Sequence, residues 1–152
     1  MVASWSQECL AQAVADVRGV EALGRPVATV YGGLCHEFPL MLMSLGLAQT
    51  VGYCRAKATV AEPSEPPKPE NLAYQTFLRH MAGVLALGET DLFDFAREAD
   101  LSGYLWATRR LLKAGVFYKH LAVSVLKVEA GDEADEAAGS RSGDEVAETP
   151  HA

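Results

Sequence analysis

The apolar run from Phe38 to Lys57 (FPLMLMSLGLAQTVGYCRAK) constrains the fold of this chain more than any other stretch. Of the fifteen residues from Leu40 to Cys54, only Ser44, Gln49 and Thr50 have polar side chains. A membrane-spanning helix needs about 20 consecutive apolar residues, so the run is too short to cross a bilayer. It predicts instead a helix that is buried on nearly all sides in a globular core.

Both ends of this run carry the signals of helix ends. Pro39 suits the first turn of a helix, where the missing backbone N–H has no intrahelical acceptor in any case. Arg55 and Lys57 lie at the other end, where positive charge interacts favourably with the helix dipole. We therefore predict one central helix whose basic end reaches the surface.

Capping residues and prolines predict two helices before the central one. Ser4 begins a capping box, which predicts a first helix from about Trp5 to Arg18. Pro26 is placed to start a second helix. Pro39 then separates this second helix from the central one.

Helical periodicity resumes after a proline-rich stretch from Glu62 to Asn71, which predicts an extended surface loop. Apolar spacing predicts a helix from Leu72 to Leu87. Thr90 is expected to cap a short helix from Asp91 to Ala99, and Asp100 to cap a final one. Because no segment alternates apolar and polar residues, the predicted fold is all-α, a compact bundle of about six helices.

The net charge of −7 comes entirely from the C-terminal residues. Residues 129–152 contain eight acidic residues and one basic residue, whereas residues 1–128 contain 12 of each. The C-terminal segment also lacks helical periodicity and is rich in Ala, Gly and Ser, which is typical of disorder. We therefore predict a single helical domain over residues 1–128 and a disordered acidic tail over residues 129–152.

A basic segment lies within the otherwise neutral domain. Leu101 to Val128 contains five basic residues and no acidic residue. A helical wheel places Arg109, Lys113, His120 and Lys127 opposite the apolar side chains of this segment. Surface helices usually mix both signs, which gains ion pairs of about 0.2–0.5 kcal/mol each. A ridge of one sign therefore indicates a polyanion or an acidic protein surface, including the chain's own tail, as its neighbour.

The sequence contains no convincing enzymatic site. His36 and Glu37 are neighbours in a helix and point about 100° apart, so they are not expected to share a pocket. His80 and His120 have no Asp, Glu or Cys three or four residues further on, as a helical metal site would require. Neither GxxxxGK[ST] nor GxGxxG occurs. We therefore expect no catalytic residue, metal, cofactor or small-molecule substrate.

One polar side chain is predicted to be buried inside the apolar run. Gln49 lies between Gly46 and Gly52, two residues that allow another backbone to approach. A buried amide needs a hydrogen-bond partner. The backbone of a neighbouring helix is the expected partner, and a bound ligand is the alternative.

The cysteines and the N-terminus predict a cytoplasmic protein. Cys9, Cys35 and Cys54 lie among apolar residues without CxxC or metal-binding spacing, so we expect buried, reduced thiols. The N-terminal residues MVASWSQEC lack the basic start and apolar core of a signal peptide.

Two stretches resemble a known family, the small helical subunit of the type III-B CRISPR effector, the Cmr complex. Phe38 to Ala58 resembles its pattern of a Pro-started apolar helix, Gly-Leu-x-Gln-Thr, an aromatic residue and Lys. Tyr104-x-x-Ala107-Thr108, with the apolar and basic helix that follows, resembles the C-terminal helix of that subunit. The resemblance covers about Trp5 to Lys127.

This resemblance implies a non-catalytic building block of an RNA-guided ribonucleoprotein that destroys invading RNA. Copies of the subunit are implied to stack in the shorter of two filaments and to line the groove where target RNA pairs with the guide. The implied partners are other subunits, copies of the chain itself, and guide and target RNA, without a membrane. The basic residues expected to contact RNA phosphates are Arg55, Lys57, Arg79, Arg109, Arg110, Lys113 and Lys119.

Two alternatives remain open at the level of sequence. In the first, the chain is a pure protein scaffold whose basic ridge contacts acidic subunits and never RNA. In the second, the chain is an enzyme that works through His36 or His120, although neither residue has the site geometry that such an enzyme requires.

Overall fold

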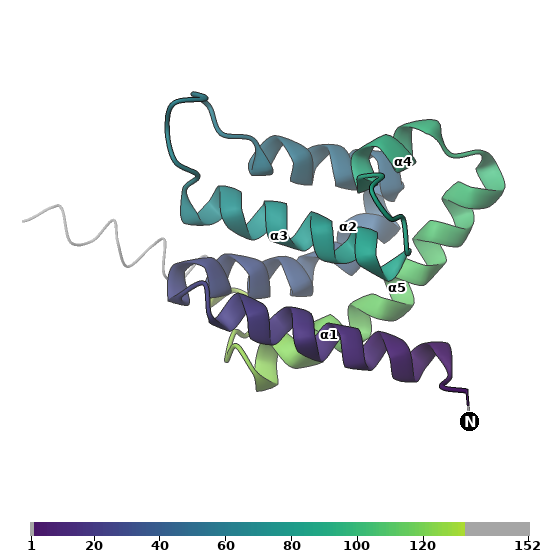
Figure 1. The fold of residues 1–152 in the computed structure, drawn as a ribbon, viewed down its shortest axis with the longest axis horizontal. Coiled ribbons are helices and arrows are strands. Elements are labelled where there is room, and N and C mark those ends of the chain that lie inside the picture. The colour runs from purple at the N-terminus through teal and green to yellow at the C-terminus, as the bar shows by residue number, and fades with distance from the viewer. Residues whose placement is uncertain (1, 133–152) are drawn as a thin grey trace, which may run out of the picture.

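The computed structural model describes residues 2–132, and this part of the chain folds into five helices without a strand (Figure 1). The helices are α1 (Trp5–Glu21), α2 (Arg25–Ala58), α3 (Pro69–Val84), α4 (Leu92–Glu98) and α5 (Leu101–Ser124). The predicted all-α class is therefore confirmed for the described residues. The predicted disorder of the tail falls mainly on residues 133–152, which lie outside the described part.

Two of the five helices start at the predicted capping residues, and α3 starts at Pro69, three residues before the predicted Leu72. Ser4 caps α1 through a capping box, and Asp100 caps α5 by accepting a 2.8 Å hydrogen bond from the N–H of Gly103. At α4 the predicted cap is wrong: Asp91 accepts from the N–H of Asp94 at 2.7 Å, where Thr90 was expected. An Asp carboxylate at the N-cap has both the hydrogen-bond acceptor and the negative charge that a helix start favours.

The longest helix, α2, is broken at Gly46 and not at Pro39. Gly46 has φ 80° and ψ 171°, a backbone conformation that is essentially confined to glycine. The helix continues through Pro39, whose ring fits against Gly115; a Cβ atom at residue 115 would lie 3.1 Å from Cγ of Pro39. The predicted boundary at Pro39 is therefore wrong. Five helices are counted, where about six were predicted, because the two halves of α2 are taken as one helix across the break at Gly46.

The chain turns sharply after Gly46, and α3 packs against both halves of α2 (Figure 1). Phe77 of α3 meets Tyr31 and Phe38 of the first half edge-on, with ring centroids 5.5 and 4.8 Å apart. From the second half, the Tyr53 ring lies 6.2 Å from that of Tyr74. The apolar run thus forms the core by folding around a partner helix.

The prediction that the apolar run is buried on nearly all sides is wrong. Leu40 and Met43 are 63% and 77% exposed, and Leu45 is also exposed. Gln49 points outward as well, because the helix restarts after the glycine break and turns Thr50 into the core. The Thr50 hydroxyl has no hydrogen-bond partner within the described residues. None of the described helices combines the length and the hydropathy needed to cross a membrane.

The residues that follow α5 fold back onto the first half of α2. Val128 is fully buried against Gly32, where a Cβ atom would lie 2.6 Å from Cβ of Val128. Nε2 of His36 lies 2.9 Å from the carbonyl oxygen of Val128, and Arg25 donates to the carbonyl of Leu126. The core therefore includes Val128, and the domain boundary predicted directly after it stays a prediction.

A chain of four polar side chains joins four of the helices inside the bundle. The Tyr118 hydroxyl of α5 donates to Oδ2 of Asp16 on α1 at 2.6 Å. Oδ1 of Asp16 lies 3.6 Å from Nε2 of His80 on α3, and Nδ1 of His80 lies 2.7 Å from the Tyr31 hydroxyl on α2. A neutral His80 with its proton on Nε2 suits both neighbours, since Tyr31 then donates to Nδ1 and Nε2–H faces the carboxylate.

This network predicts that the protein loses stability as the pH falls below about 6.5, the ordinary pKa of histidine. Burial lowers the pKa of His80, and nearby Arg79 lowers it further while Asp16 opposes both. The unfolded chain therefore binds the proton first, and the free energy of unfolding falls by up to about 1.4 kcal/mol per pH unit. The free energy of unfolding has its full value above pH 6.5.

Urea denaturation at pH 5.5 and 7.5 measures this effect. The matched variant His80→Gln removes the titrating group, so its unfolding free energy is expected to change much less between the two pH values. Equal pH dependence of the two proteins would assign the effect to another group.

Candidate nucleic-acid interface

The outer face of α5 carries a group of three cations. Ser102, Leu105, Trp106, Arg109, Arg110 and Lys113 line a hollow of about 330 Å³ on this face. Arg109 and Lys113 are exposed, one turn apart, as the helical spacing predicted. The lining contains three cations and no acid, so the hollow favours a negatively charged ligand.

Both tryptophans of the chain converge on one of these cations. The guanidinium carbon of Arg110 lies 4.5 Å from the ring centroid of Trp5 on α1 and 5.9 Å from that of Trp106. Trp5 is partly buried against the core, whereas 42% of Trp106 is exposed. Cation–π attraction therefore fixes Arg110 against α1, and the Trp106 ring remains accessible beside Arg109 and Lys113.

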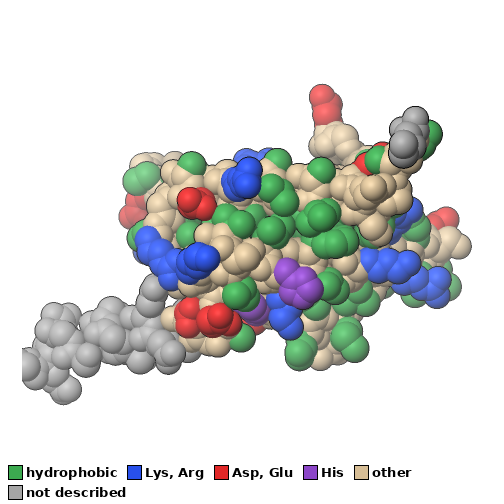
Figure 2. Space-filling view, turned by 90° about the horizontal axis from the view of Figure 1, so that it is seen from below, with side chains coloured by type: hydrophobic (Ala, Val, Ile, Leu, Met, Phe, Trp, Pro, Cys, Tyr) green, Lys and Arg blue, Asp and Glu red, His purple; other side chains and the backbone are tan. Residues whose placement is uncertain are grey.

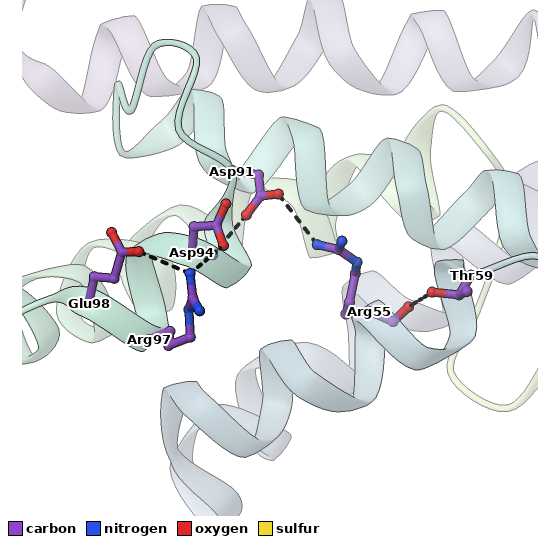
Figure 3. A network of polar contacts seen from close by, with 6 residues as sticks. All are labelled: Arg55, Thr59, Asp91, Asp94, Arg97 and Glu98. Atoms are coloured by element: carbon purple, nitrogen blue, oxygen red, sulfur yellow. Dashed lines mark hydrogen bonds and ion pairs between the residues drawn. The ribbon is translucent and has the colours of Figure 1, made fainter.

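Arg55, another predicted RNA contact, is engaged within the protein. Its Nη1 lies 3.3 Å from Oδ2 of Asp91, the cap of α4, and its guanidinium lies over the Phe93 ring at 5.1 Å. Figure 3 shows Arg55 reaching from α2 to this cap, and Arg97 lying between Asp94 and Glu98 on the other side. Arg55 thus joins α2 to α4 and offers less free charge than Arg109.

Lys57 and Arg79 also lie away from the α5 hollow. Nζ of Lys57 lies 3.4 Å from Oε1 of Glu70 and 5.9 Å from the Tyr53 ring centroid. Arg79, exposed on α3, shares with Arg55 a hollow of about 590 Å³ that Glu89 and Asp91 also line. The acids in this lining offset the two cations, so this hollow has no net preference for anions.

The predicted basic residues therefore do not form one face. Arg109, Arg110 and Lys113 lie together, Arg55 and Arg79 line the other hollow, and Lys119 is exposed further along α5. A third hollow has lining residues in common with each of these two. It shares Gly83 with the hollow of Arg79, and Trp106 and Arg110 with the α5 hollow. Figure 2 shows Lys and Arg side chains in separate groups on one face, with hydrophobic side chains between them.

Neither His36 nor the cysteines form a reactive site within the described residues, and His120 is exposed on α5. His36 contacts the carbonyl of Val128 and does not pair with the exposed Glu37. No group of three or more His, Cys, Asp or Glu within residues 2–132 is placed to hold a metal ion. All three cysteines are free and buried, as predicted. Burial raises the pKa of Cys54 to about 12 and raises the pKa of Cys35 further, so these thiols stay protonated near neutral pH.

Exposed apolar side chains flank the α5 hollow. Leu101, Leu105 and Val116 of α5 are 73%, 45% and 51% exposed. Leu40 and Met43 of α2 are exposed close to Pro39, which packs against Gly115 of α5. Contiguous patches of exposed apolar side chains are typical of protein contact sites.

The sequence prediction of this site omitted its aromatic part. Trp106 precedes Arg109 by three residues and Arg110 by four, so helical spacing already places it beside both. The contribution of Trp5 comes from the packing of α1 on α5 and has no signal in the local sequence.

An all-helical fold with an acid-free basic hollow, an exposed indole and exposed apolar residues is typical of a subunit that binds other macromolecules. A family model described as CRISPR-associated protein (Cas_Cmr5) matches residues 5–125. Since this match spans most of the sequence, the chain belongs to the Cas_Cmr5 family, the small structural subunits of the CRISPR Cmr complex. The predicted family is therefore confirmed. A comparison with curated proteins finds no match.

Proposed function

We propose that this chain is a non-catalytic structural subunit of a cytoplasmic type III-B effector. In this proposal the chain stacks with copies of itself in the minor filament and contacts RNA phosphates beside the guide–target groove. Membership of the Cas_Cmr5 family supports the proposal that the chain is a subunit of this effector complex. The observation that carries the RNA contact is the hollow on α5, where Arg109, Arg110 and Lys113 gather without an acid. Phosphates are the anions that such a complex contains in regular array.

The contacts of the predicted residues support a ranking within the set that we propose to contact RNA. Arg109 and Lys113 form its centre, because both are exposed and line the acid-free hollow. Arg110 supports them while packed on Trp5. Lys119 and Arg79 are peripheral members of the set. Arg55 and Lys57 already pair with Asp and Glu side chains, so we assign them a secondary contribution.

The alternative function, a protein scaffold without RNA contact, also has an observation in its favour. The exposed Leu40, Met43, Leu101 and Val116 offer an apolar surface for neighbouring subunits. In that case the cations of α5 contact acidic side chains of other subunits. The two functions differ in whether RNA affinity depends on Arg109 and Lys113.

Charge reversal at the centre of the hollow tests the proposal. Arg109→Glu with Lys113→Glu is expected to weaken target-RNA binding by the reconstituted complex about tenfold or more. Each phosphate contact contributes roughly 0.7 to 0.9 to the slope of log K against log salt, so two lost contacts lower the slope by about 1.5 for each copy that touches RNA. Titration of labelled RNA at 0.05 to 0.3 M salt measures both quantities.

The matched control is Arg18→Glu with Lys68→Glu, which changes the net charge equally at two exposed positions outside the hollow. This control is expected to leave the salt slope unchanged. Equal slopes for the two double variants, in complexes of normal composition, would favour the scaffold function.

A further inference from the structure

We propose that the hollow on α5 binds one unpaired nucleotide of RNA, with its base stacked on the exposed ring of Trp106 and its phosphates at Arg109 and Lys113. This inference rests on the proposed function, because it assumes that RNA reaches α5. It adds a base-dependent contact to the phosphate contacts already proposed. The size of the hollow, about 330 Å³, lies at the lower end of small-ligand sites, as expected for a single nucleotide.

The indole of Trp106 is the flat wall of this site. With 42% of its surface exposed, it is the larger of the two exposed apolar side chains that line the hollow, the other being Leu105. The ring is anchored on one side by the helix and by Arg110, which is itself held over Trp5. An anchored aromatic ring that remains accessible loses little conformational entropy when a base stacks on it.

The cations around this ring favour a nucleotide over a neutral ligand. Arg109 lies three residues after Trp106 and Lys113 seven residues after it, so both side chains emerge on the same face of α5. A nucleotide combines a π-face with negative charge on either side, which matches an aromatic wall between cations. An acidic protein segment supplies the charge without the stacking surface.

The stacked base must be unpaired, because a base within a duplex has both faces covered by its neighbours. Proteins that bind single strands gain roughly 1–3 kcal/mol per base from an aromatic platform, which corresponds to a fold-change of about 5 to 150 in affinity. Stacking tolerates all four bases, since each of them has a π-face. The site therefore distinguishes a base from its absence and does not read sequence.

Abasic substitution of the target RNA tests this contact in the reconstituted complex. Each nucleotide of the target is replaced in turn by an abasic residue, and the affinity of each RNA is measured for complexes with native subunit, Trp106→Ala or Trp106→Phe. At one or more positions the native complex is expected to lose about 5- to 150-fold on removal of the base. The Trp106→Ala complex is expected to show no such loss there, and Trp106→Phe to retain most of it.

Abasic losses of equal size in native and Trp106→Ala complexes at every position would overturn the inference. A loss of subunit incorporation in Trp106→Ala, with unchanged RNA affinity of the complexes that do form, would assign Trp106 to a protein contact and also overturn it. The phosphate contact is tested separately by Arg109→Glu with Lys113→Glu. If that variant weakens binding while Trp106→Ala does not, the proposed function stands and the stacking contact fails.

Discussion

Replacing Asp16 by alanine is expected to lower the free energy of unfolding by about 1–3 kcal/mol, because it removes the acceptor of a buried hydroxyl. Asp16 accepts the Tyr118 hydrogen bond at 2.6 Å and faces Nε2 of His80 at 3.6 Å. Tyr118 is fully buried, and 11% of the His80 side chain is exposed. Without the carboxylate, the buried Tyr118 hydroxyl loses its acceptor at roughly 1–3 kcal/mol, and His80 loses a charged neighbour that lies beyond hydrogen-bond distance.

Glu8→Ala is the matched control for this variant, because it removes an exposed carboxylate from the same helix. Glu8 lies in the first turn of α1, so its loss is expected to lower stability by about 0.3–1 kcal/mol through the helix dipole alone. Chemical denaturation at pH 7.5 measures both variants. An Asp16→Ala protein within 0.5 kcal/mol of the Glu8→Ala protein would show that the network contributes little.

Replacing Gly46 by alanine is expected to lower the free energy of unfolding by about 1–3 kcal/mol. The φ of 80° and ψ of 171° at this position lie in a region that is essentially confined to glycine. The break also leaves the first N–H groups of the second half of α2 without helical acceptors, and the Tyr104 hydroxyl accepts from the N–H of Ala48 at 2.9 Å. A shifted break would lose this bond.

Gly52→Ala in the same helix is expected to act in the opposite direction. A Cβ atom at residue 52 meets nothing within 4 Å, and the residue has helical geometry. Alanine there reduces the entropy of the unfolded chain and is expected to stabilise the protein by about 0.4–1 kcal/mol. Thermal or urea denaturation measures both variants. A Gly46→Ala protein as stable as the Gly52→Ala protein would contradict the structural role of the break.

The sequence predicted those features of the fold that depend on neighbouring residues. The caps at Ser4 and Asp100 follow from local hydrogen-bond chemistry, and the α5 faces follow from helical spacing. The position of the break in α2 depends on tertiary packing, because the Pro39 ring packs closely against Gly115, 76 residues later. The break then sets the helical phase that turns Gln49 outward.

The candidate site also contains some features that the local sequence predicts and others that depend on tertiary packing. Arg109 and Lys113 could be predicted because one helix holds both and no acid interrupts the segment. The engagement of Arg55 by Asp91, 36 residues away, required the packing of α4 on α2. The pairing of Asp16 with His80 likewise joins residues that only the bundle brings together.

Ultraviolet crosslinking of the assembled complex, followed by mass spectrometry, tests the central claim most directly. The complex is loaded with its guide and a target RNA, irradiated and digested, and peptides from residues 101–128 are searched for nucleotide adducts. We predict adducts on the peptides that contain Trp106, Arg109 or Lys113, lost when target RNA is omitted. Complexes of normal composition in which residues 101–128 crosslink to acidic peptides of other subunits and never to RNA would contradict the account.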